Sequence, residues 1–111
     1  MKSLNEFEHC AQRLKALADP ERLRIVNCLF GGPRNVGDLA AQLSDEIVKV
    51  SHHLGILRNA NLVQATKEGR FVVYALHPDV AAMPVANRRQ IDLGCCRLDL
   101  EQDATRAKAR A

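Results

Sequence analysis

The fold is decided by residues 44–57, which read SDEIVKVSHHLGIL. The apolar residues of this stretch recur at intervals of three and four, the spacing of one helix face: Ile47, Val50, Leu54 and Leu57. Successive side chains of a helix are separated by about 100°. The opposite face is therefore predicted to carry Val48, Lys49, His52, Ile56 and Asn59, with Ser51 and His53 at its margins.

A second short helix is predicted directly before this one. Val36, Leu39, Ala40 and Leu43 share one face of it, and only Ser44, Asp45 and Glu46 remain for the connection. Two short helices joined by so tight a turn form a helix-turn-helix. Upstream, one amphipathic helix is predicted over 4–17. Another begins at Asp19-Pro20-Glu21 and ends at Gly31-Gly32-Pro33.

The periodicity changes from that of a helix to that of a strand after Asn61. Residues 63–67 and 70–76 alternate or are β-branched, and Glu68-Gly69 separates them as a two-residue hairpin loop. Lys67 and Arg70 then lie at the hairpin tip. A helix-turn-helix followed by a hairpin with a basic tip is a winged helix, a mainly α fold with a β-hairpin wing.

The C-terminal part predicts less regular structure. His77-Pro78-Asp79 can begin a helix, but Pro84 interrupts it and Gly94 follows it, so a short or broken helix is expected. Residues 1–100 are predicted to form one domain. Residues 101–111 are predicted to be a charged, disordered tail, because they have no apolar stripe.

Composition limits the classes of function. The 111 residues are 47% apolar and carry a net charge of +3, which permits nucleic-acid binding. No apolar run reaches 18 residues and the N-terminus lacks a signal-peptide core, so a cytoplasmic protein without a membrane partner is expected. No catalytic triad, phosphate loop or paired-carboxylate motif is present, which argues against an enzyme.

The exposed face of the helix at residues 47–59 has the chemistry of a DNA reader. Lys49, Ser51 and His52 carry donors that can reach phosphates or base edges in the major groove, and Val48 shares their surface. His53 lies closer to the core, where capping or packing explains it equally well. Lys67 and Arg70 suit a phosphate or minor-groove contact. The alternative without DNA binding is an ordinary polar face for the helix and a solvated hairpin end for Lys67 and Arg70.

The four cysteines include one adjacent pair, Cys95 and Cys96. All four are expected to be thiols in a cytoplasmic chain, and Cys28 lies in an apolar stripe that predicts a core position. Cys95 and Cys96 are adjacent, so a bond between them is strained, but together they offer two soft sulfur donors. A third thiolate would suit trivalent arsenic or antimony, and such a site also suits Hg(II), Cd(II) or Cu(I). Incidental cysteines near the chain end are the alternative.

Three stretches in order resemble the ArsR/SmtB winged-helix repressors: residues 17–25, LADPERLRI; residues 50–54, VSHHL; and residues 68–74, EGRFVVY. The resemblance covers residues 7–76. It implies a homodimer whose first and last helices form the interface, and binding to double-stranded DNA that a metal, metalloid or redox signal releases. The two-fold symmetry implies an inverted-repeat operator with half-sites about one helical turn apart. The resemblance also places Cys10 near the interface.

The sequence departs from two metal sites that are common in that family. Residues 35–39 read NVGDL, without a thiol, and no histidine follows His77. The resulting hypothesis is a repressor released by a soft metal or metalloid bound to Cys95, Cys96 and the partner subunit's Cys10, without an obligatory cofactor. The alternatives are a redox or reactive-sulfur switch, in which Cys95 or Cys96 forms a disulfide with Cys28 or Cys10, and a winged-helix module without an inducer that binds protein.

Overall fold

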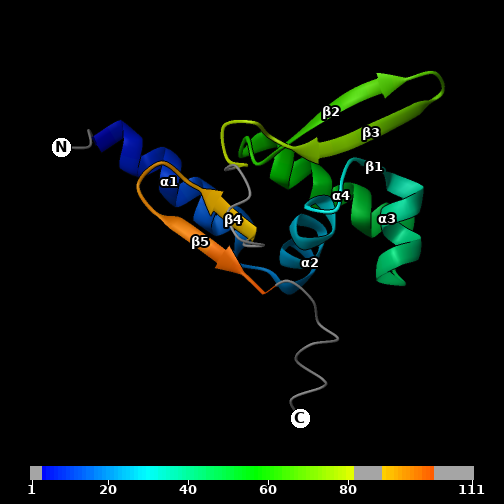
Figure 1. Ribbon diagram of the computed structural model, residues 1–111, viewed down its shortest axis with the longest axis horizontal. Coiled ribbons are helices and arrows are strands. Elements are labelled where there is room, and N and C mark those ends of the chain that lie inside the picture. Colours follow the sequence, from blue (N-terminus) through cyan, green and yellow to red (C-terminus); the bar gives the residue numbers. More distant parts are fainter. Residues whose placement is uncertain (1–3, 82–88, 102–111) are drawn as a thin grey trace, which may run out of the picture.

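The computed structural model describes residues 4–81 and 89–101, which form four helices and five strands (Figure 1). In chain order these are α1 (Leu4–Leu17), α2 (Pro20–Leu29), β1 (Arg34–Asn35), α3 (Val36–Leu43), α4 (Ile47–Asn59), β2 (Val63–Glu68), β3 (Phe71–Leu76), β4 (Arg89–Asp92) and β5 (Arg97–Leu100). The predicted disordered tail falls almost wholly on residues 102–111, which lie outside the described residues. The helix-turn-helix and the wing are confirmed.

Asp19 starts α2 in the way that its sequence predicts. Its carboxylate accepts hydrogen bonds from the backbone N–H groups of Glu21 and Arg22, at 2.8 and 3.1 Å, and Pro20 occupies the first helical position. These two N–H groups have no partner within the helix, so the side chain supplies one. The Arg22 N–H bond is the main cause that holds the pKa of Asp19 below its ordinary value, and burial opposes it.

Replacing Asp19 by alanine is expected to lower the free energy of unfolding by about 1 kcal/mol at pH 7. The carboxyl is more acidic in the folded chain than in the unfolded chain. Its contribution is therefore complete above the unfolded pKa and is lost as the pH falls through the lowered folded pKa. Urea unfolding of the parent and variant at pH 7 and pH 3 checks this. An equal difference at both pH values would contradict the assignment.

The helix-turn-helix consists of α3 and α4. Ser44 ends α3 in the left-handed conformation, with φ of 54°, and only Asp45 and Glu46 intervene before α4. Val50, Leu54 and Leu57 of α4 are buried, as predicted. Ile47 was predicted to share their stripe, but its side chain is 55% exposed. Ile47 is the first residue of α4 and precedes the buried residues by which this helix packs against the core.

The wing belongs to a three-stranded antiparallel sheet in the order β1-β3-β2. Glu68 pairs with Phe71, so the loop is Gly69-Arg70, one residue later than predicted. Gly69 has a φ of +62°, a conformation that glycine adopts without strain. The short strand β1 was not predicted. It pairs Arg34 with Tyr74 and so joins the start of α3 to the wing.

The helix predicted after His77 is wrong where the structure describes the chain. His77 begins a turn, and β4 and β5 form an antiparallel hairpin beside α1 (Figure 1). The residues of β5 alternate between exposed and half-buried, a strand periodicity that spans only 4 residues. Arg89 fastens this hairpin to α2 by donating to the backbone and side-chain oxygens of Asn27, at 2.8 and 2.7 Å.

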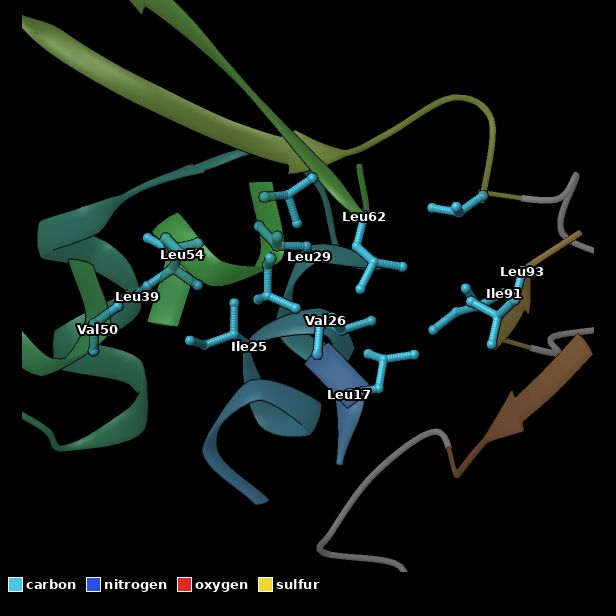
Figure 2. Packing of buried hydrophobic residues seen from close by; sticks show 14 of the residues in the cluster. Leu17, Ile25, Val26, Leu29, Leu39, Val50, Leu54, Leu62, Ile91 and Leu93 are labelled. Carbon is cyan, nitrogen blue, oxygen red and sulfur yellow. The ribbon is translucent and has the colours of Figure 1, made fainter. Parts of the chain in front are cut away.

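One hydrophobic cluster joins the helices to this hairpin (Figure 2). Its largest fully buried aliphatic side chains are Ile25, Leu39, Leu54, Leu57, Leu62, Ile91 and Leu93. The apolar side of the amphipathic helix predicted over 4–17 is only partly buried in α1, because Leu17 is in the core whereas Phe7 and Leu14 are 51% and 39% exposed. Among the described residues, no helix is long and apolar enough to cross a membrane.

Candidate nucleic-acid interface and cysteine cluster

The solvent face of α4 presents the side chains that were predicted to read DNA. Val48 is 78% exposed, and Lys49, Ser51 and His52 are also exposed. The buried residues on the opposite side of α4 pack against the core. They fix the orientation of the helix, so that its polar face is presented to solvent. Ile56, predicted to point away from the core, is instead half-buried and packs against it.

His53 has a different position from His52. Its side chain is half-buried, and its Nδ1 atom lies 3.1 Å from Nη1 of Arg22. Because a guanidinium can only donate, Nδ1 accepts this hydrogen bond. Arg22 also donates from Nε to the Ala16 carbonyl at 2.5 Å. This arginine therefore ties α4 to the α1–α2 junction, a role that no local sequence pattern predicts.

An open hollow of about 650 Å³ lies between α2 and the start of α4. Val48, Lys49 and His52 line one side of it, and Glu21 and Arg24 of α2 line the other. Four of the predicted DNA-binding residues, these three and His53, therefore line the same concave surface.

Lys67 and Arg70 are exposed at the tip of the wing, which projects away from the helices (Figure 1). Replacing both by alanine is expected to weaken binding to all DNA sequences similarly. It should also reduce the slope of log affinity against log salt by about one unit for each phosphate that is no longer neutralised. Salt titrations with an operator and an unrelated duplex measure this, with Lys15→Ala on α1 as the control. An unchanged slope in a folded variant would exclude the wing from the interface.

The structure brings Cys10, Cys95 and Cys96 together within one chain. Cys10 is fully buried on α1, whereas the other two are half-buried in the turn between β4 and β5. Their sulfur atoms all lie within 4.8 Å of one another. Cys10 and Cys95 form a disulfide, and the Sγ atoms of Cys10 and Cys96 are 3.9 Å apart.

This arrangement corrects two expectations. Cys10 and Cys95 were predicted to be free thiols, and Cys10 was expected to reach the pair from the partner subunit. The hairpin that replaces the predicted last helix instead folds back on α1 of the same chain, so no partner is needed to complete the cluster. Cys28 lies outside it, half-buried against the core, and burial raises the pKa of its thiol.

The turn that carries the cysteines is internally braced. The Leu93 N–H donates to the Cys96 carbonyl at 2.9 Å, and the Gly94 N–H donates to Oδ1 of Asp92 at 2.9 Å. Gly94 has a φ of +98°, which side chains rarely adopt. Arg13 of α1 also contacts this turn, since its Nη1 atom donates to the Leu93 carbonyl at 3.3 Å.

Known proteins resemble this chain in sequence. Residues 19–65 match the profile of the family described as bacterial regulatory protein, arsR family. The transcriptional repressor SdpR of Bacillus subtilis is 36% identical over 66 residues, which cover 60% of this chain and 73% of SdpR. The HTH-type transcriptional regulator CmtR of Mycobacterium tuberculosis is 40% identical over 95 residues, covering 86% of this chain and 78% of CmtR.

The solved structures agree with the sequence relatives. The homodimeric winged helix-turn-helix DNA-binding domain of Mb0332 from Mycobacterium bovis, a possible ArsR-family regulator, superposes with a TM-score of 0.64 at 29% identity. The match covers 68% of this chain and 73% of that one. The chain therefore belongs to the ArsR family of winged helix-turn-helix transcriptional regulators, which bind DNA and are not enzymes.

Proposed function

We propose that this protein is a dimeric repressor that a soft metal or metalloid ion releases from its operator by binding to the thiolates of Cys10, Cys95 and Cys96. The observation that carries this proposal is the clustering of three sulfur atoms within 4.8 Å of one another. In the reduced protein, three thiols so close together, supplied by α1 and by a braced turn, would be a donor set for one soft ion.

The DNA-binding part of the proposal uses α4 and the wing. Val48, Lys49, Ser51 and His52 would read base edges in the major groove, with His53 at the margin, and Lys67 and Arg70 would contact the backbone or minor groove. A homodimer would read an inverted repeat with half-sites about one helical turn apart. The exposed Phe7 and Leu14 of α1 support dimerisation through that helix. A bacterial regulator of this kind would act in the cytoplasm.

The chemistry of the cluster selects the ions. Thiolates prefer soft acceptors, so trivalent arsenic or antimony, Cd(II) and Hg(II) are the proposed inducers. The ligands must be deprotonated, and affinity should therefore rise with pH. The Cys10–Cys95 disulfide must be reduced before all three sulfurs can bind an ion.

That disulfide favours a second candidate function, a redox switch. A peroxide would oxidise the two thiols: the Cys10–Cys95 bond forms, and hydrogen peroxide accepts two electrons and two protons to become two water molecules. In this case the oxidised and reduced proteins would differ in operator affinity without any metal.

The test measures operator affinity of the reduced parent with and without trivalent arsenic, Cd(II) or Hg(II), and after oxidation by peroxide. We expect the inducing ion to weaken binding by about 5–150-fold, the usual range of coupling between two sites. The Cys95→Ser, Cys96→Ser double variant should bind the operator as the parent does but not respond. Cys28→Ser is the matched control, because Cys28 lies outside the cluster.

Each outcome decides between the candidates. Release of the double variant by the same ion at the same concentration would exclude the proposed thiol site. Release of the parent by peroxide but by none of the ions would establish the redox switch instead. A folded parent that binds no duplex from the region upstream of its own gene would favour the protein-binding module.

A further inference from the structure

We propose that Arg13 is a positioning residue that couples the cysteine turn to the reading helix α4. This inference rests on the proposed function, because it concerns how a change at the sulfur atoms reaches the DNA-binding face. It does not depend on which ion, or which oxidant, acts at the cluster.

A single side chain connects the two sites. Nε of Arg13 donates to the carbonyl oxygen of Ala60 at 3.3 Å, and Nη1 donates to the carbonyl oxygen of Leu93 at 3.3 Å. Ala60 is the residue that caps the C-terminus of α4, and Leu93 precedes Gly94-Cys95-Cys96. Cys10 lies three residues before Arg13 on α1, about one helical turn away.

The chemistry of arginine suits this position. A helix leaves its last carbonyl groups without partners, and a positive charge at that end is favourable. The planar guanidinium presents several donors in a fixed fork, so it can hold two carbonyls in one relative geometry. The half-buried Arg13, a residue of α1, therefore caps the C-terminal end of α4. The same side chain also binds the turn that carries Cys95 and Cys96.

In this proposal, a change in the sulfur cluster is transmitted through the turn. Its internal hydrogen bonds, from Leu93 to Cys96 and from Gly94 to Asp92, make it move as a unit. The positions of Cys95 and Cys96 relative to Cys10 differ between a disulfide and a set of three thiolates around one ion. When the turn shifts, the Leu93 carbonyl shifts with it. The Arg13 side chain must then either move with that carbonyl or change its hydrogen bond to the Ala60 carbonyl.

The experiment compares Arg13→Met, which removes both donors and keeps a long apolar stem, with the parent. Lys15→Met is the matched control, since it removes a positive charge from the exposed side of the same helix. Arg13→Lys, which keeps the charge and a donor, should give partial rescue. The measurements are the thermal midpoint, the thiolate charge-transfer absorption with Cd(II), and hydrogen exchange of the Ala60, Asn61 and Leu62 amides in the oxidised, reduced and Cd(II)-treated proteins.

In the parent, we expect exchange at the end of α4 to differ between the oxidised and reduced proteins, and Cd(II) to weaken operator binding by about 5–150-fold. In Arg13→Met, the Cd(II) absorption and the operator affinity without Cd(II) should stay at the parent's values. The exchange difference should disappear, and the release by Cd(II) should fall to less than about one-fifth of the parent's factor.

Two results would overturn the role of Arg13: a parent whose exchange at residues 60–62 does not change between the oxidised and reduced states, or an Arg13→Met protein that changes as much as the parent. Because this readout needs no metal, it decides the inference even where the ion fails to release the operator. A parent that binds Cd(II) and keeps its full operator affinity would contradict the proposed metal response and not the coupling.

Discussion

Replacing Leu54 by alanine is expected to lower the free energy of unfolding by about 2–5 kcal/mol, a large share of the roughly 5–15 kcal/mol that stabilises a typical domain. Leu54 is fully buried on the inner face of α4 and lies in the cluster that unites the helices. The variant loses the transfer free energy of the removed carbons, and a cavity remains because the surrounding side chains relax only partly.

Chemical denaturation followed by circular dichroism measures this effect. The parent and variant must be compared at one protein concentration, because dimerisation adds to the apparent stability. Val48→Ala on the opposite face of α4 is the matched control. Its side chain is 78% exposed, so a change within about 0.5 kcal/mol is expected. A Leu54→Ala protein no less stable than this control would contradict the inward orientation of that face.

The second large effect concerns DNA affinity. Alanine at Lys49 or His52 is expected to weaken operator binding by about 1–3 kcal/mol for each base contact that the substitution removes. Both side chains are exposed beside the hollow between α2 and α4, so the substitutions should leave the core intact. Titration of a labelled operator at one fixed salt concentration measures the decrease, since affinities at different salt concentrations are not comparable.

An unrelated duplex and an Asn59→Ala variant provide the controls. The duplex reports contacts to the backbone, so Lys49→Ala and His52→Ala should reduce the ratio of specific to nonspecific affinity. Asn59 is exposed at the C-terminal end of α4, away from the N-terminal residues that enter the groove. If both alanine variants bind the operator as the parent does, this face of α4 does not read DNA.

Local sequence determined the winged helix because each of its elements has a short-range cause. Asp19 accepts N–H bonds from the first turn of its own helix, and the buried residues of α4 follow the helical period. The wing likewise follows from alternating residues on both sides of a glycine loop. Within the hairpin the loop position changed by one residue, since pairing along the whole ladder decides it, and the third strand of the sheet, β1, was not predicted.

Tertiary structure decided the C-terminal hairpin and everything that depends on it. The β4–β5 hairpin is held against α2 by long-range contacts, such as those of Arg89 with Asn27. Those contacts join residues 62 positions apart. Sequence periodicity reports only near neighbours, so it carries no signal for them.

The sulfur cluster shows the same division. Sequence alone singled out Cys95 and Cys96, because adjacent thiols are two soft donors wherever the chain takes them. That Cys10 of the same chain lies beside them, 85 residues away, depends on the hairpin folding back onto α1. The same packing placed Arg13 between the cysteine turn and the end of α4. Local chemistry therefore determined which side chains can act, and long-range packing decided which of them meet.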